Sequence, residues 1–350
     1  MTYFAIIGNE AFAEEELVLC NITNISKHTD YLRTFDTQHP EQLAQCGTLI
    51  KRGTVSDFSW LEKNLEEVKI IGVYQKEVGI RLKKEWRVSR YKILTPEHSD
   101  KEIKAKWTEI VAIDKRYDVR GTVTGRQNIA LYEDVDFGRP VRGMQIGMMP
   151  AKLAHFLINL GRVYHKKQDR PNSTDKLTIR DPFVGFGTTS FLVNNLWHHA
   201  ISSDINITPC KKNRQRREKT ERYTKHKHIS FKHDILDPIR KSFVTNTDII
   251  VTEWRLGPIV RGNLHLAQAK INQDEIRKIY NWFLTNVGKF FKKTMTMVFT
   301  IPYYTAHDIS IAPKVQDFCK QKNWNLKIIP TLYQRKKQHV ARQICVIETK

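Results

Sequence analysis

The stretch LTIRDPFVGFGTTSFLVNNL, residues 177–196, decides the fold. It opens with a short β-branched run that ends in Asp181, continues through a tight loop with Gly185 and Gly187, and passes directly into a helical pattern. A strand, a glycine loop and a helix in this order are typical of sheets that bind a ligand at the carboxyl ends of their strands. The glycines let the backbone come close to that ligand.

The sequence after residue 140 repeats this alternation of strand and helix. Leu153, Leu157 and Leu160 form one helical stripe, and residues 272–293 have a second apolar helical face. The strand-like runs are HAISSDI, HISFKHDI, DIIVTE, MTMVFTIP, LKIIPTLY and QICVIET. This pattern predicts an α/β domain over residues 141–350 with a mainly parallel, doubly wound sheet. The last two runs have no helix between them and predict a hairpin at the sheet edge.

The first 140 residues differ from the rest and predict a small α+β module. The run 10–22 begins with acidic residues and reads as a helix. The runs expected to form strands are YFAIIG (3–8), GTLIKRG (47–53), VGIRL (78–82), WTEIVAI (107–113) and NIALYE (128–133).

The charge of the chain indicates the kind of partner that the protein binds. The formal net charge is +21, and proteins this basic commonly bind nucleic acid, because lysines and arginines that meet phosphates release counterions. Residues 211–228 hold many of these cations; a solvated helix face is the alternative explanation. The N-terminus has no signal-like region and no apolar run approaches a membrane span, so we expect a cytoplasmic protein with no membrane association.

The five cysteines are isolated in sequence and predict reduced thiols without a metal site.

Carboxylates end three successive predicted strands, at Asp181, Asp204 and Asp234. A dinucleotide fingerprint would need a third glycine where Ser190 stands, and the loop has no phosphate-binding lysine. Acids at strand ends around a glycine loop suit S-adenosylmethionine instead. We expect Asp204 to bind the ribose hydroxyls, Asp181 to face the methionine amino group and Asp234 to accept from the adenine amino group. The predicted cofactor-binding residues are Asp181, Phe183, Gly185, Gly187, Asp204 and Asp234.

Two segments carry a resemblance to a known family. RPVRGMQIGMMPAKLAHFLINL (139–160) and DPFVGFGTTS (181–190) resemble the THUMP-domain tRNA (guanosine-N2) methyltransferases, the archaeal and eukaryotic enzymes acting on guanosine 10 and their bacterial relatives. In that family a segment R-P-x-R-D…G-M-L-P-P-K-L-A precedes a loop D-P-F-C-G-x-G-T. This chain departs from the first segment at Gly143, Met149 and Ala151. Residues 3–17, 43–53 and 333–348 are also similar to the family. The positions that match the first segment are Arg139, Pro140, Arg142, Gly147, Met148, Pro150, Lys152, Leu153 and Ala154.

The resemblance implies a fold, an activity and partners. It implies a ferredoxin-like and THUMP module over residues 1–140 that grips tRNA, followed by a Rossmann-like class I methyltransferase domain. The expected activity is S-adenosylmethionine-dependent N2-methylation of a guanosine in tRNA. An activating protein partner is compatible with the resemblance.

The loop after the run DIIVTE departs most from the family. There the family has Asp or Asn, two prolines and Tyr or Phe, whereas this chain has Glu253, Trp254, Arg255 and Leu256. We expect Glu253 to accept a hydrogen bond from the target amine and Trp254 to pack near the base. A cation at Arg255, about 5 Å from a sulfonium, would repel it by roughly 3 kcal/mol at an effective dielectric of about 20.

Three placements of Arg255 therefore stay open. It pairs with Glu253, it faces RNA phosphate, or it marks a site that no longer transfers methyl groups. The predicted catalytic residues are Glu253, Trp254 and Arg255. The alternatives to an RNA methyltransferase are a catalytically impaired RNA-binding protein of the same fold and a DNA amino-methyltransferase.

Overall fold

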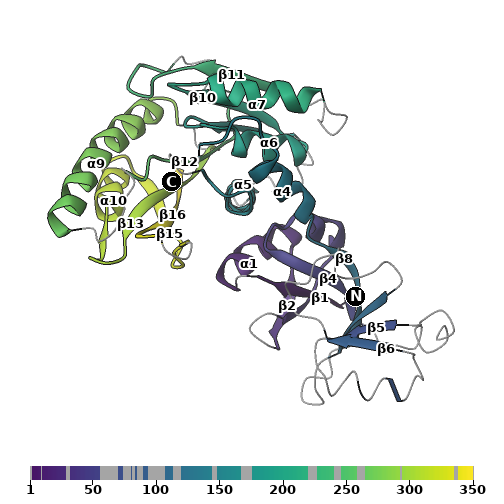
Figure 1. Cartoon of the computed structure of the whole chain (residues 1–350). Helices are drawn as coiled ribbons and strands as arrows, with labels where there is room; N and C mark the ends of the chain where they lie inside the picture. The colour runs from purple at the N-terminus through teal and green to yellow at the C-terminus, as the bar shows by residue number, and fades with distance from the viewer. Residues whose placement is uncertain are drawn as a thin grey trace. The chain divides into compact units, whose positions relative to one another are not determined.

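The computed structural model resolves the chain into two compact units, Met1–Ala130 and Leu131–Lys350 (Figure 1). The boundary lies inside helix α4 (Ile129–Phe137). The structure describes residues 2–8, 10–28, 32–55, 70–73, 80, 83–84, 90–93, 107–112, 120–143, 148–166, 176–219, 227–239, 246–257, 265–291, 294–334 and 338–349.

The first unit contains one mixed sheet. Its strands are β1 (Thr2–Ile7), β2 (Thr23–Lys27), β3 (Leu32–Asp36), β4 (Leu49–Val55), β5 (Ile70–Val73), β6 (Arg90–Ile93), β7 (Trp107–Ala112) and β8 (Arg120–Arg126). They pair in the order β2-β3-β1-β4-β8-β7-β5-β6. The pairs are antiparallel from β2 through to β7, and β5 is parallel to both β7 and β6. Helix α1 (Glu10–Leu17) and the 3-10 turns η1 (Val18–Cys20) and η2 (Pro40–Gln45) complete the described part.

Most expected strands of this unit are confirmed, and one is wrong. Residues 128–133 were expected to be extended, whereas the structure places residues 129–133 in the first turns of α4. Tyr132 and Val135 are buried one helical turn apart, and the polar residues between them face outward, which is a helical rather than an alternating pattern. Most of the run 78–82 lies outside the described residues.

The second unit alternates strands and helices along the chain. Its strands are β9 (Thr178–Asp181), β10 (His199–Asp204), β11 (His228–Lys232), β12 (Ile249–Glu253), β13 (Thr296–Tyr304), β14 (Ile309–Ser310), β15 (Trp324–Ile328) and β16 (Val340–Thr349). Its other helices are α5 (Ala151–Lys166), α6 (Thr188–Asn195), α7 (Thr208–Glu218), α9 (Leu266–Gly288) and α10 (Ala312–Gln321).

The sheet of this unit has the order β11-β10-β9-β12-β13-β16-β15, with β14 paired to β13. The first five strands are parallel, and β16 runs antiparallel between β13 and β15. This confirms the predicted α/β class and the edge hairpin. A parallel sheet whose strand order reverses beside its first strand is Rossmann-like. The antiparallel strand β16, second from the edge of the sheet, gives this sheet the class I methyltransferase arrangement.

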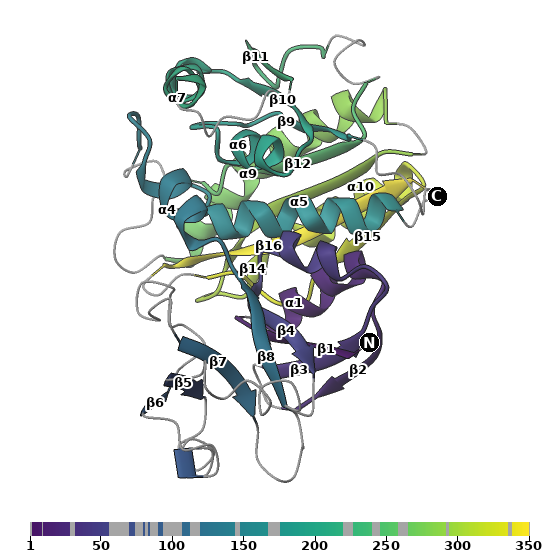
Figure 2. The ribbon, with the colours of Figure 1, turned by 90° about the vertical axis from the view of Figure 1, so that its right-hand side faces the viewer.

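Helices cover both faces of the second sheet. Figure 1 shows α9 and α10 on one side and α5, α6 and α7 on the other, and Figure 2 views the sheet from the side of α5 and α6. Leu153, Leu157 and Leu160 of α5 are all buried, as the helical stripe predicts. The α9 face packs into a large apolar cluster with α10 and the strands, through Ile276, Tyr280, Phe283, Leu284 and Val287.

The topology brings β9 and β12 side by side, with Ile179 opposite Ile249. The chain leaves β9 toward β10 and β11 and returns at β12 on the other side of β9. Loops diverge at such a switch point and leave a crevice outside the carboxyl ends of the strands, which is where open α/β sheets bind ligands. None of the helices in the described ranges combines the length and hydropathy needed to cross a membrane.

Candidate active site

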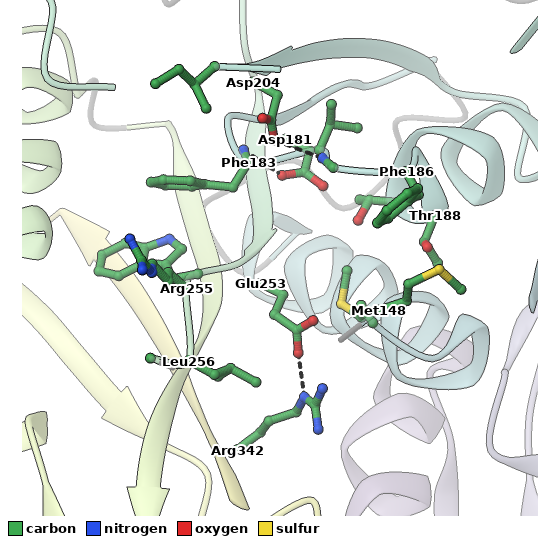
Figure 3. Close-up of a pocket in the computed structure, with 17 residues that line it drawn as sticks. Met148, Asp181, Phe183, Phe186, Thr188, Asp204, Glu253, Arg255, Leu256 and Arg342 are labelled. Atoms are coloured by element: carbon green, nitrogen blue, oxygen red, sulfur yellow. Dashed lines mark hydrogen bonds and ion pairs between the residues drawn. The ribbon is translucent and has the colours of Figure 1, made fainter. Parts of the chain in front are cut away.

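A cavity of about 560 Å³ opens at this switch point (Figure 3). It is formed by the ends of β9, β10 and β12 and the loops that follow them, with contributions from the segment before α5 and from β16. The lining residues are Met148, Met149, Asp181, Phe183, Val184, Gly185, Phe186, Thr188, Thr189, Asp204, Ile205, Glu253, Trp254, Arg255, Leu256, Gly257 and Arg342.

The glycine loop has a conformation that its sequence explains. Gly185 and Gly187 have φ values of +50° and +93°, which side-chain-bearing residues rarely adopt. A Cβ on Gly187 would also lie 2.6 Å from the Phe191 ring. The Gly187 amide donates to the Val184 carbonyl at 2.8 Å, which closes the turn before α6. Of the two glycines, Gly185 lines the cavity and Gly187 supports the turn behind it.

Asp181 ends β9 beneath the loop with only 3% of its surface exposed. Its carboxylate accepts hydrogen bonds from the Thr252 hydroxyl at 2.6 Å and from the Phe183 amide at 3.0 Å. Burial raises the pKa of Asp181 to about 6, although hydrogen bonds from Thr252, Thr189 and Phe183 work in the opposite direction. A cationic group of a ligand would therefore stabilise the ionised form of the Asp181 carboxylate, which burial disfavours.

Asp204 ends β10 on the neighbouring side of the cavity. One of its oxygens accepts from the Gly185 amide at 2.9 Å, and the other accepts from the Asn206 amide at 2.9 Å. The Gly185 bond ties the glycine loop to the end of β10. Ile205 follows directly, lines the cavity and is 61% exposed, so it offers an apolar surface beside the carboxylate.

Asp234 is not brought to the cavity. It follows the end of β11 by two residues and accepts from the Leu236 amide at 3.0 Å, as in a local turn. It is absent from the residues that line the cavity. The structure thus assembles Asp181, Asp204 and the glycine loop, and leaves the third predicted acid outside.

Glu253 ends β12 and pairs with Arg342 of β16 (Figure 3). Both side chains are largely buried, with 13% and 3% of their surface exposed. The register explains the contact, because Glu253 lies opposite Thr300 of β13 while Arg342 lies opposite Pro302, two residues further along that strand. Arg342 is itself fixed, since it donates to the Gln338 side chain at 3.2 Å and lies over the Tyr333 ring.

Trp254 belongs to the cavity wall, but its ring is buried in the core, and the expectation that it packs near a substrate base stays a prediction. Only 2% of its surface is exposed. Its ring stacks on Phe299 with centroids 4.3 Å apart, and meets Tyr280 and Phe283 edge-on. Because strand alternation sends Glu253 and Trp254 to opposite faces of the sheet, the aromatic residue joins the cluster under α9. Phe186, which is partly exposed at the cavity, was missed by the sequence analysis.

Arg255 lines the cavity and is exposed. It makes no hydrogen bond or ion pair with any residue in the described part of the chain, and Figure 3 shows it pointing away from the Glu253 carboxylate. Of the three placements considered, pairing with Glu253 is wrong, because Arg342 occupies that position.

Arg342 and Ile205 are the main site residues that sequence reasoning missed. Arg342 belongs to the segment 333–348, which entered the sequence analysis only through its similarity to the family. Its role depends on β16 inserting between β13 and β15, which no local pattern shows. Met148 of the cavity wall belongs to the motif 139–160, of which residues 144–147 lie outside the described residues.

No family model and no curated protein matches this chain. Among solved structures, the N-terminal domain of human METTL16 in complex with SAH has 11% identity and a TM-score of 0.42, covering 68% of this chain and 89% of that one. The human methyltransferase 10 domain containing protein has 12% identity and a TM-score of 0.41, covering 63% and 96%. The ribosomal protein L11 methylase from Lactobacillus delbrueckii subsp. bulgaricus has 12% identity and a TM-score of 0.33, covering 55% and 79%. Likenesses this weak identify neither the ligand nor the reaction of this chain.

Proposed function

We propose that the protein is an S-adenosylmethionine-dependent RNA methyltransferase that methylates the N2 amino group of a guanosine in tRNA. The observation that carries the proposal is the meeting of Asp181, Asp204 and Glu253 in one cavity, each at the end of a parallel strand. Two of these carboxylates adjoin the glycine loop, and the third is aimed from the opposite wall by Arg342.

The loop side of the cavity fits the methyl donor. A cavity of about 560 Å³ has the size of a small-molecule site. Asp181 would hold the donor's ammonium group, Asp204 would accept from the ribose hydroxyls, and Ile205 would cover one face of the adenine. The backbone at Gly185 allows close approach because the residue lacks a side chain. When bound, S-adenosylmethionine supplies a methyl group on a sulfonium, activated for attack by a nucleophilic nitrogen.

The β12 side of the cavity fits the amine. The lone pair of an exocyclic amine is delocalised into the base, so hydrogen-bond acceptors on its N–H groups are needed to orient it. Glu253 provides one oxygen to Arg342, and its second oxygen makes no hydrogen bond with a described residue. That oxygen is placed to accept from the amine and to take the proton that leaves when the new N–C bond forms.

Arg342 explains how Glu253 could act as the hydrogen-bond acceptor at a position where the resembled family has the shorter Asp or Asn, followed by two prolines. The guanidinium fixes the orientation of the longer Glu253 side chain, which the loop alone would leave free to rotate. Its own contacts to Gln338 and Tyr333 hold it in place. The ion pair thus replaces the rigidity that prolines would give to the loop.

The choice of tRNA and of guanosine depends on the sequence resemblance and on charge. The first unit would serve as the ferredoxin-like and THUMP-like module that docks the RNA, and an activating protein partner would be compatible with this role. A net charge of +21 suits a protein whose substrate is a polyanion.

Binding without catalysis is the competing function, and two observations favour it. Trp254 is buried in the core, and Arg255 leaves a cation at the cavity. A catalytic protein and a binding protein would both lose RNA affinity with salt, but only the first transfers methyl groups.

The test is methyl transfer from labelled donor to an unmodified tRNA transcript and to a matched transcript in which inosine replaces guanosine. Inosine lacks the 2-amino group, so the proposal predicts label in the first RNA and none in the second. Equal labelling of both would exclude N2 of guanosine as the acceptor. Labelling of duplex DNA in place of RNA would assign the DNA amino-methyltransferase function.

A further inference from the structure

Helix α7 has two faces with different chemistry. The inward face is formed by Cys210, Asn213, Arg214 and Arg217, at the spacing of one side of a helix. Cys210 packs with Val184 behind the glycine loop. The helix therefore has a buried face fixed by packing, even though most of its residues are polar.

Two arginines of α7 have structural partners. Arg217 pairs with Asp134 at 2.8 Å and lies over the Phe191 ring at 4.8 Å. Arg214 pairs with Glu218 at 3.2 Å and donates to the His228 carbonyl at 3.1 Å. These cations hold the helix to its own domain and are not available to a ligand.

The outward face carries four cations of another kind. All four are exposed, and none of their side chains has a hydrogen-bond or ion-pair partner within the described part of the chain. Lys212 and Arg216 are four residues apart, a spacing at which like charges destabilise a helix by about 0.2–0.5 kcal/mol. An anion bound between these two cations would relieve their mutual repulsion. Its members are Lys211, Lys212, Arg216 and Lys219.

Helix α7, which carries this face, is linked to the cavity. Helix α7 starts three residues after Ile205, which lines the cavity. The Asn213 amide group donates to the carbonyls of Val141 and Phe186 at 3.0 Å each, and Phe186 is itself a lining residue. An anion held on the outer face of α7 would thus be bound by an element that also fixes the cavity wall.

We propose that the outer face of α7 binds the phosphate backbone of the RNA strand that delivers its base to the cavity. The inference rests on the proposed function for the choice of RNA, and on the four exposed cations for the surface itself. Charge complementarity supports this occupant, because a row of exposed cations on a rigid helix matches a chain of regularly spaced phosphates. Contacts of this kind give affinity and register rather than sequence choice.

The experiment compares two variants of the full-length protein that lose the same charge. The first replaces the α7 set, as K211Q/K212Q/R216Q/K219Q. The matched control, K270Q/K278Q/K314Q/K320Q, replaces four exposed lysines of α9 and α10. Binding of tRNA is measured over a range of salt concentrations, and the melting temperature of each variant reports its fold. No methyl transfer is involved in the measurement.

The α7 variant should show a slope of log affinity against log salt that is smaller by about 3, as expected for four lost phosphate contacts. The control should keep the wild-type slope. Equal slopes for both variants would overturn the inference, because charge alone would then explain RNA binding. A loss of slope specific to α7 in a protein that transfers no methyl group would support this surface and contradict the proposed function. Tighter retention of duplex DNA than of RNA by the same surface would overturn the choice of RNA.

Discussion

At the scale of single residues, Asp181 is the clearest test of the donor site. Its buried carboxyl has a pKa raised to about 6, and a ligand ammonium would favour the ionised form. Donor affinity should therefore be greatest near pH 7 and fall by about tenfold per pH unit below pH 6, as the carboxyl takes up a proton. Titration calorimetry with S-adenosylmethionine between pH 5 and 8 measures this, and Asp181→Asn should abolish both tight binding and its pH dependence.

Asp234 supplies the control for that measurement. Asp234→Asn makes the same chemical change at an acid that does not line the cavity, and it should leave the donor affinity within twofold of wild type. A large loss for Asp234→Asn, or an unchanged affinity for Asp181→Asn, would contradict the arrangement of the site.

Glu253 and Arg342 should act as one unit in catalysis. Glu253→Gln removes the acceptor charge and should lower kcat by about 100-fold or more with donor affinity preserved. Arg342→Gln leaves the Glu253 side chain unguided and should also lower kcat, whereas in the Glu253→Gln background it should have little further effect. Steady-state kinetics of the two single variants and the double variant gives this coupling.

Arg277→Gln is the matched control for the pair. Arg277 forms an exposed ion pair with Asp274 on α9, away from the cavity, and its loss should leave kcat unchanged. Fully additive losses from the Glu253 and Arg342 variants would show that the ion pair has no role in positioning the acceptor.

At the scale of elements, the loop after β12 divides its residues between the cavity and the core. Trp254→Ala should lower the free energy of unfolding by about 3–5 kcal/mol, because the indole is surrounded by Phe299, Tyr280 and Phe283. Trp254→Phe should cost much less, since it also removes a buried indole N–H that has no hydrogen-bond partner among the residues that the structure describes. Denaturant unfolding measures both.

Arg255, the exposed neighbour of Trp254, provides a control for this prediction. Arg255→Ala should change the free energy of unfolding by no more than about 0.5 kcal/mol. If Trp254→Ala were as mild as Arg255→Ala, the indole would have to be a surface group in solution, free to meet a base.

Local pattern was sufficient to predict the first strand, glycine loop and helix of the second unit. Residues 177–196 contain the signals for all three in sequence, and the positive φ values of Gly185 and Gly187 explain why glycine stands there. The contacts of Trp254 were beyond prediction, because Phe299 belongs to another strand and Tyr280 to a helix. The strand expected at 128–133 failed because a short apolar run fits a helix or a strand equally well.

At the scale of the whole molecule, we expect the second unit to bind the methyl donor and the first unit to dock the tRNA. A fragment of residues 127–350 keeps α4 intact together with the second hydrophobic core, so it should fold and bind S-adenosylmethionine like the full chain. It should lose most of its affinity for tRNA if the first unit docks the RNA. Calorimetry with donor and filter binding with tRNA check the two halves of this prediction.

Undiminished tRNA affinity of the fragment would remove the docking role from the first unit. A fragment that folds but fails to bind the donor would show that the cavity needs residues outside the second unit.

Long-range assembly also limits what the sequence could predict of the site. Glu253 and Arg342 are 89 residues apart and meet only because β16 inserts between β13 and β15. Strand ends, by contrast, share one edge of a parallel sheet, so the meeting of Asp181 and Asp204 followed from the order of elements alone. Asp234 failed to join them because it lies two residues beyond its strand, in a turn of its own.

The most direct test of the proposed function is the transfer of labelled methyl groups from S-adenosylmethionine to unmodified bulk tRNA, followed by nucleoside analysis. We predict labelled N2-methylguanosine, which would show that the loop at residues 253–256 is a working variant of the family's catalytic loop. Absence of label, with donor and tRNA both bound, would contradict this account and leave the protein as a binding protein.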